Sequence, residues 1–163
     1  MTDQGGGNDT RSLGPVVVYD PNAGFVTGGG WIISPAGAYV ANPSLTGRVN
    51  FGFNAKHLNN QARLTGETEF QLQLADINFH STGYAWLVLT GPKASMAIWD
   101  RIGTINGAGS YYFQFTVVDG DRDGTGIDKM RMRIRDVTSG TVVYDTGETL
   151  IPLASGSIVI HAG

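Results

Sequence analysis

Residues Lys129–Arg135, with the sequence KMRMRIR, alternate strictly between cationic and apolar side chains. Successive side chains of a β-strand point to opposite faces, so Met130, Met132 and Ile134 share one face of such a strand. The same period of two recurs in three further segments, Thr46–Ala55, Glu67–Leu74 and Tyr111–Val118. This repeated alternation predicts half-buried antiparallel strands.

The composition and the spacing of turn residues extend this prediction to the whole chain. Glycine supplies 24 of the 163 residues and only 15% are charged, a balance that suits strands and tight turns better than helices. We expect an all-β fold of about 8–10 strands, an antiparallel sandwich in slight preference to a flattened barrel, with a strand order that the sequence does not decide. The expected core consists of Val49, Phe51, Phe53, Phe70, Leu72, Leu74, Leu87, Phe113, Phe115, Met132 and Ile134.

The chain is expected to form one domain. Its length suits a single core, and residues 15–163 are assigned to one β domain. Residues 1–14 are assigned to a flexible lead-in, which lacks the apolar segment of a signal peptide. No apolar stretch approaches the roughly 18 residues that cross a bilayer, so we expect no membrane span. The absence of cysteine excludes disulfides and thiolate metal sites.

Three successive glycines, Gly28–Gly30, interrupt the strand expected from Phe25 to Ser34. Glycine inside a strand marks either a bulge or a place where another backbone approaches closely. The sequence leaves both interpretations open.

The segment DGDRDGTGID, which starts at Asp119, concentrates four of the fourteen acidic residues within ten positions. Its D-x-D-x-D-G spacing is that of the first half of an EF-hand loop, in which alternate side chains bind Ca²⁺ and glycine permits the bend. Met130 stands where the bidentate glutamate of an EF-hand would be, and Asp128 is the available substitute. The sequence predicts a calcium site formed by Asp119, Asp121, Asp123, the carbonyl of Thr125 and Asp128. The alternative is a solvated acidic loop.

Aromatic residues suggest a second candidate site. Trp99 precedes Asp100 and Arg101 and is expected to be partly exposed, so that with Tyr111 and Tyr112 it could stack against a sugar ring. Trp31 and Trp86 are expected in the core instead.

The histidines and the basic residues suggest no site from their spacing. His57, His80 and His161 lie far apart in the chain, although a zinc site assembled across strands remains open. The basic residues of Lys129–Arg135 are interpreted as the solvent-facing side of one strand, because a net charge of −3 does not favour nucleic acid. No Gly-x-Ser-x-Gly motif is present.

Several segments resemble a known family. The runs FVTGGGWI (from Phe25), NFHST (from Asn78) and GTING (from Gly103) are similar to the post-COAP (post choice-of-anchor protein) domain of bacterial secreted multidomain proteins. The similarity extends from about Val16 to the C-terminus. It implies a β-rich extracellular module beside other domains of a longer chain, and it brings no catalytic residues.

These observations lead to three functional hypotheses. The first is a non-catalytic structural or interaction module, secreted or on the cell surface, that is stabilised by calcium and contacts neighbouring domains. The second is a carbohydrate-binding module that uses the aromatic site. The third is a small barrel enzyme or ligand carrier, which requires an internal cavity lined by polar groups.

Overall fold

The computed structural model describes residues 24–57 and 64–162, so the assignment of residues 1–14 to a lead-in lies outside the described part. The described residues form ten strands, a four-residue helix α1 (Gly120–Asp123) and two 3₁₀ turns. The strands are β1 (Gly24–Ser34), β2 (Gly47–His57), β3 (Leu64–Leu72), β4 (Ile77–Thr90), β5 (Met96–Ile105), β6 (Ala108–Val118), β7 (Lys129–Asp136), β8 (Val142–Asp145), β9 (Ile151–Pro152) and β10 (Ser155–Ala162). The all-β prediction is therefore confirmed.

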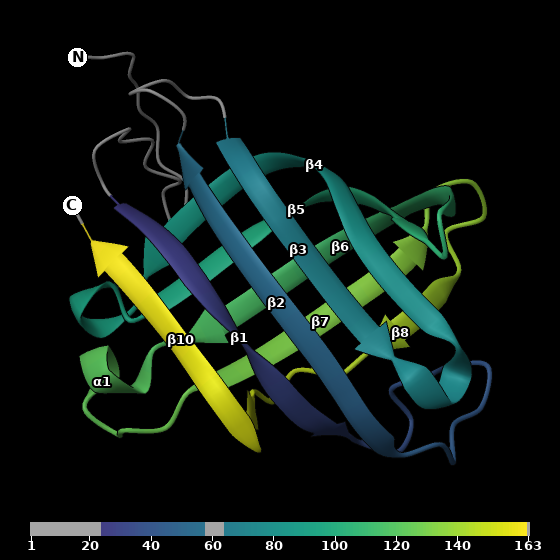
Figure 1. Cartoon of the computed structure of the whole chain (residues 1–163), viewed down its shortest axis with the longest axis horizontal. Helices are drawn as coiled ribbons and strands as arrows, with labels where there is room; N and C mark the ends of the chain where they lie inside the picture. The colour runs from purple at the N-terminus through teal and green to yellow at the C-terminus, as the bar shows by residue number, and fades with distance from the viewer. Residues whose placement is uncertain (1–23, 58–63, 163) are drawn as a thin grey trace.

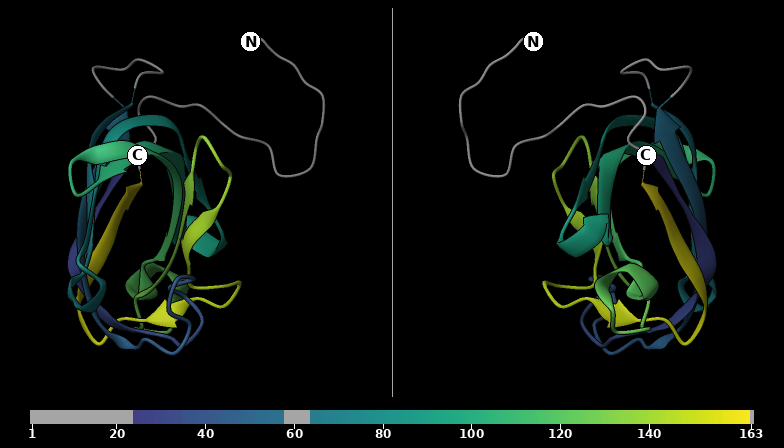
Figure 2. Two further views of the ribbon diagram at one scale, coloured as in Figure 1. Left: turned by 90° about the vertical axis from the view of Figure 1, so that its right-hand side faces the viewer. Right: turned by 90° about the vertical axis from the view of Figure 1, so that its left-hand side faces the viewer.

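All ten strands belong to one antiparallel sheet (Figure 1). Its order is β10-β1-β2-β3-β4-β5-β6-β7-β8, and the short β9 pairs with the beginning of β7. The chain therefore winds as a meander from β1 to β8, and its last strand returns to lie beside its first. Seen end on, the sheet curls into a flattened half-barrel with two facing walls (Figure 2). Of the two expected arrangements, the flattened barrel describes this continuous sheet.

The inner face of the curled sheet carries the core. Every member of the expected core is buried except Leu74, whose side chain lies outside the described part. Aromatic rings fill the space between the two walls: Phe53 and Trp99 contact Phe115, with ring centroids 5.3 and 5.1 Å away. Tyr144 packs on Phe70 and hydrogen-bonds the buried Ser34 hydroxyl at 2.8 Å. Trp31 departs from the expectation, because it is half-buried on the outer face beneath Arg48.

The three glycines of β1 mark a close approach between strands. The pairing of β1 with both β2 and β10 runs through Gly28–Gly30 without a shift in register, so the strand contains no bulge there. A Cβ on Gly30 would lie 2.1 Å from the carbonyl oxygen of Ser155, and one on Gly28 would meet the ring of Phe53 at 2.7 Å. Glycine therefore lets β10 and a core phenyl ring pack directly on the backbone of β1.

The two edges of the sheet are joined without a continuous ladder between them. At the β8 edge, the loop after β1 pairs through Tyr39 with Tyr144, and the Val40 amide donates to the Val143 carbonyl at 3.2 Å. At the β10 edge, two aspartate carboxylates accept hydrogen bonds from backbone amides, as described below. A loop and two side chains thus connect the edges of the half-barrel to the facing wall.

Candidate functional site

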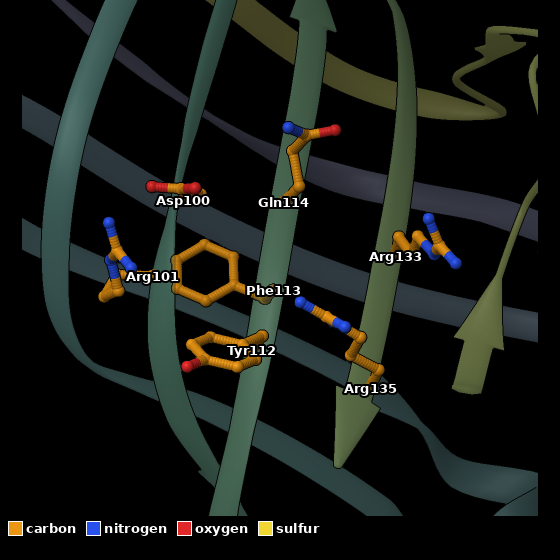
Figure 3. Close-up of a pocket in the computed structure, with 7 residues that line it drawn as sticks. All are labelled: Asp100, Arg101, Tyr112, Phe113, Gln114, Arg133 and Arg135. Atoms are coloured by element: carbon orange, nitrogen blue, oxygen red, sulfur yellow. The ribbon is translucent and has the colours of Figure 1, made fainter. Parts of the chain in front are cut away.

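A pocket of about 320 Å³ lies on the outer face of β5, β6 and β7 (Figure 3). We call it the arginine pocket. It is lined by Asp100, Arg101, Tyr112, Phe113, Gln114, Arg133 and Arg135. Tyr112, Gln114, Arg133 and Arg135 alternate with buried core residues along β6 and β7. The same alternation that builds the core therefore presents these polar groups to solvent.

Strand register places the lining residues in two rows. Asp100, Gln114 and Arg133 lie directly opposite one another across β5, β6 and β7. One step along the same face, Tyr112 lies opposite Arg135, whose guanidinium carbon is 4.9 Å from the centre of the Tyr112 ring. This stacking holds one cation at the side of the pocket and supports it by a cation–π contact.

Arg101 reaches the pocket from an unusual backbone conformation. Its φ angle is +156°, and its side chain is exposed although its cross-strand partner Phe113 is in the core. The pairing of β4 with β5 shifts register at this point, between Tyr84 and Trp86. The extra residue lies in β4, and on β5 it is the irregular φ angle of Arg101 that accompanies the outward position of its side chain; irregularities of this kind are frequent beside functional sites. Two successive residues of β5, Asp100 and Arg101, consequently line one pocket.

The pocket is cationic in a protein of net charge −3. Arg101, Arg133 and Arg135 supply three positive charges and Asp100 one negative charge. Asp145 on β8 pairs loosely with Arg133, at 3.5 Å between Oδ2 and Nε. Three guanidinium groups against two carboxylates leave one net positive charge around the pocket, which favours an anionic ligand.

The structure does not bring the three predicted sugar-stacking residues together. Trp99 is fully buried, and its Nε1 donates to the Thr68 hydroxyl at 2.9 Å, so the expectation that it is exposed is wrong. It lies on the inner face of β5 because Ala97 and Trp99 continue the buried alternation of that strand. Tyr111 packs against the core, whereas Tyr112 is half-buried in the arginine pocket. Only Tyr112 of the three is placed beside a candidate ligand site.

Two of the predicted calcium ligands bind the edge strand β10. Asp119, 5% exposed, accepts the Ile160 amide at 2.9 Å with Oδ2 and the Asp121 amide at 3.0 Å with Oδ1. Asp128 accepts the Ile158 amide at 2.8 Å with Oδ2 and the Gly120 amide at 2.7 Å with Oδ1. Each carboxylate therefore links β10 to the loop between β6 and β7. We call this pair the aspartate latch.

The other predicted ligands face the exposed side of the same loop. Asp121 is exposed, and Asp123 accepts both the amide and the hydroxyl of Thr125, at 2.8 and 2.7 Å. The Thr125 hydroxyl and amide keep the pKa of Asp123 below its ordinary value. Two carboxylates of the loop thus bind the sheet edge, and two lie on its exposed side. Calcium binding by this loop stays a prediction.

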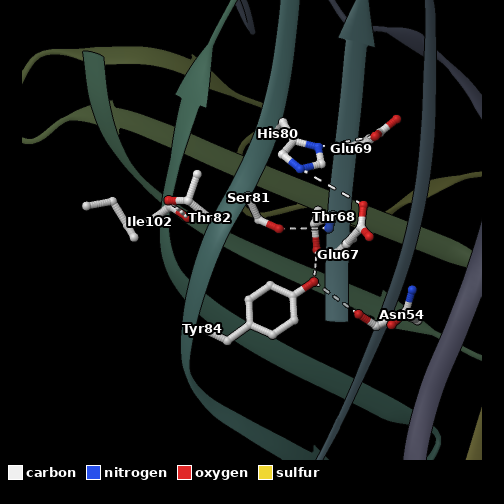
Figure 4. A network of polar contacts seen from close by, with 9 residues as sticks. All are labelled: Asn54, Glu67, Thr68, Glu69, His80, Ser81, Thr82, Tyr84 and Ile102. Carbon is white, nitrogen blue, oxygen red and sulfur yellow. Dashed lines mark hydrogen bonds and ion pairs between the residues drawn. The ribbon is translucent and has the colours of Figure 1, made fainter. Parts of the chain in front are cut away.

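A different group of ligand atoms does gather on the outer face of β3 and β4 (Figure 4). One group of three acidic or histidine side chains within the described ranges has ligand atoms that all lie within 4.8 Å of one another. It consists of Glu67, Glu69 and His80. The Nδ1 atom of His80 is 3.1 Å from Glu69 and its Nε2 is 4.0 Å from Glu67. The histidine ring lies between two carboxylates, and its hydrogen bond to Glu69 explains this arrangement without a metal ion. The sequence did not indicate it, because Glu69 and His80 meet only through the β3–β4 register.

Beneath this group, polar side chains connect β3 and β4 where the two strands separate (Figure 4). The Thr68 amide donates to the Ser81 hydroxyl at 2.8 Å in place of a ladder bond. The Thr68 and Tyr84 hydroxyls are 2.7 Å apart, and Tyr84 donates to the Asn54 carbonyl at 3.0 Å. Burial raises the pKa of Tyr84. We assign this network a structural role.

The chain has no match among protein-family models, curated proteins or solved structures. Within residues 24–57 and 64–162, no helix has the length and apolarity needed to cross a membrane. The site is therefore interpreted from its own geometry.

Proposed function

We propose that the domain is a non-catalytic interaction module of a larger secreted or cell-surface protein, and that it binds an anionic partner through the arginine pocket. The observation that carries the proposal is the gathering of three guanidinium groups around one outer-face pocket. The aromatic packing between Phe53, Trp99 and Phe115 occupies the middle of the barrel. This packing favours recognition at the outer face over the carrier hypothesis.

The extracellular setting rests on the resemblance to the post-COAP domain. Such a module would lie beside other domains of one chain, and a neighbouring domain is one source of an anionic group. The absence of cysteine is compatible with a secreted bacterial protein, although it does not require one. Calcium bound at the loop between β6 and β7 would stabilise the module in that setting.

A carbohydrate-binding module is the second candidate function. Tyr112 supplies part of an aromatic face, and Gln114 supplies both a donor and an acceptor in the same pocket. These groups suit a hydroxylated ligand better than a simple inorganic anion.

The proposed function predicts that small anions bind at the pocket. Adding sodium acetate to ¹⁵N-labelled protein should shift the amide resonances of β5, β6 and β7, at constant ionic strength. The variant Arg135→Ala should weaken the response. Arg48→Ala is the matched control, because Arg48 also stacks on an aromatic ring of the outer face, 4.4 Å from the centre of the Trp31 ring, but lies on β2. Equal responses in wild type and Arg135→Ala would contradict the proposal.

A further inference from the structure

We infer that the arginine pocket recognises a carboxylated saccharide, a uronic acid unit of an acidic polysaccharide. The inference rests on the proposed function, and it names the ligand class of the same pocket. It combines three properties of the lining: a small net positive charge, a stacked guanidinium, and uncharged or acidic acceptors among the cations.

The charge of the pocket suits a monoanion. Asp100 lines the pocket and Asp145 contacts Arg133, so the three guanidinium groups are already partly neutralised. A dianionic phosphate ester would bring more charge than the remaining single positive charge balances, and it would face the Asp100 carboxylate. A carboxylate matches that charge, and its two oxygens match the planar fork of a guanidinium.

The remaining groups suit hydroxyls. Gln114 lies between Asp100 and Arg133 in one cross-strand row, so an acceptor, an amide and a donor stand side by side (Figure 3). A carboxylate has about four acceptor positions, and Asp100 can therefore accept from a ligand hydroxyl in addition to its contacts within the protein. Adjacent ring hydroxyls of a sugar can donate to Asp100 and accept from Gln114. The Tyr112 ring, one side of which Arg135 covers, adds apolar area beside these polar groups.

The size of the pocket suits a short segment of such a polymer. Its volume of about 320 Å³ is at the lower end of the roughly 300–1,000 Å³ of small-ligand sites. The pocket is lined by residues of three neighbouring strands on the outer face, β5, β6 and β7. Nucleic acid is less favoured, because Tyr112 is the one aromatic residue of the lining that is not buried, whereas single-stranded nucleic acid is bound by stacking successive bases on aromatic side chains.

Titration with defined oligosaccharides tests the inference. A galacturonate trimer should bind the whole domain and shift the resonances of β5, β6 and β7. The fully methyl-esterified trimer, which has the same sugar ring but no charge, should bind at least about tenfold more weakly, because it loses a charge-assisted hydrogen bond. Arg135→Ala should lower the affinity for the acidic trimer, whereas Arg48→Ala should leave it unchanged.

A second variant separates saccharide recognition from anion binding. Gln114→Ala removes an uncharged side chain, so it should weaken binding of the galacturonate trimer several-fold and leave the response to acetate unchanged. Equal affinity for the acidic and esterified trimers would overturn the inference. So would tighter binding of a single-stranded oligonucleotide than of the trimer at the same salt concentration. If acetate binds and the trimer does not, the inference fails and the proposed function stands; if no anion binds, both fail.

Discussion

Single carboxylates bind the free edge of β10, where a neighbouring strand would otherwise be needed. Ile158 and Ile160 lie two residues apart, so their amides point to the same edge of β10. A neighbouring strand would offer carbonyl oxygens to these amides, and here Asp128 and Asp119 offer carboxylate oxygens instead. Each carboxylate has a second oxygen, which binds an amide of the loop that carries it. Only a side chain with two acceptor oxygens can make both bonds in this way.

Removing one acceptor oxygen of the latch should destabilise the fold. Asp128→Asn keeps the shape of the side chain but turns one oxygen into a donor, which then faces an amide. We expect the free energy of unfolding to fall by about 1–3 kcal/mol, measured by urea denaturation. Asp121→Asn is the control, because it makes the same chemical change on an exposed side chain of the same loop. Equal losses in the two variants would show that the latch contributes nothing specific.

Tyr144 should make the stability sensitive to alkaline pH. Burial raises the pKa of its hydroxyl to about 12, above the ordinary value near 10. The unfolded chain releases this proton first, so the stabilising contribution is complete below pH 10 and is lost as the pH rises toward 12.

Tyr144→Phe checks this behaviour. The variant should lose about 1–3 kcal/mol at neutral pH, because the buried Ser34 hydroxyl loses its 2.8 Å partner. Between pH 10 and 12, the stability of the variant should also fall less steeply than that of wild type. Thermal unfolding of both proteins across this range measures the difference. An unchanged slope would show that Tyr144 does not titrate in this way.

Residue-level prediction from the sequence succeeded where alternation was regular and failed where the backbone departs from it. Met130, Met132 and Ile134 are buried as their period of two indicates. Trp99 was expected outside because Asp100 and Arg101 follow it, but the unusual backbone at Arg101 brings two polar residues outward together. A backbone angle of this kind could not be predicted from the alternation of polar and apolar residues.

At the scale of elements, glycine decides how β10 attaches to β1. Gly30 and Gly156 lie opposite each other, and a Cβ on Gly156 would lie 2.4 Å from the Cα of Gly30. The two backbones are therefore too close for any side chain between them. The sequence predicted a bulge or a close approach at Gly28–Gly30, and the close approach is what the structure contains.

Substituting Gly30 should loosen this strand pair. In Gly30→Ala the added methyl group would overlap the Ser155 carbonyl, which is backbone and cannot turn away. We expect a loss above about 2 kcal/mol and faster amide exchange along β10. Gly124→Ala is the matched control, since Gly124 also has a positive φ but no atom lies within 4 Å of the place its methyl group would take. That variant should lose only the roughly 1–2 kcal/mol of a left-handed backbone. The prediction fails if the two variants are equally stable.

The strands themselves were predictable, but their joining was not. The alternating segments of β2, β3, β6 and β7 carry their period in sequence. The contacts that complete the barrel join residues far apart, such as Asp119 with Ile160 and Tyr39 with Tyr144. A period of two says which face a residue occupies, but not which strand lies beside it. The arginine pocket depends on the same information, because Asp100, Gln114 and Arg133 meet only through strand register.

At the scale of the whole molecule, the charges are separated by strand. The arginine pocket lies on β5, β6 and β7, whereas Glu67 and Glu69 project from the outer face of β3 beside His80. The loop between β6 and β7 adds further acidic groups at one end of the barrel (Figure 1). An anionic polymer is thus attracted to one region of the outer surface and repelled from others, which gives its approach a direction.

Calcium should stabilise the whole domain if the exposed side of that loop binds it. Extracellular modules bind calcium at about 0.1–1 mM, and at ten times the dissociation constant the folded state gains roughly 1.4 kcal/mol. For a domain of this size the melting temperature would rise by about 3–5 °C between chelator and excess calcium. Magnesium should stabilise less, because it requires compact octahedral geometry.

The division of the loop into a latch and an exposed side makes this prediction specific. Asp121→Asn and Asp123→Asn should abolish the calcium-dependent rise. In chelator, Asp121→Asn should leave the melting temperature nearly unchanged, whereas Asp123→Asn should lower it slightly, because its bonds to Thr125 are weakened. Asp128→Asn should instead lower the melting temperature in both buffers, because the Ile158 amide loses its acceptor whether or not an ion is present. Thermal unfolding of the four proteins in each buffer separates the two roles. If wild type melts at the same temperature in both buffers, the acidic loop serves the sheet edge alone.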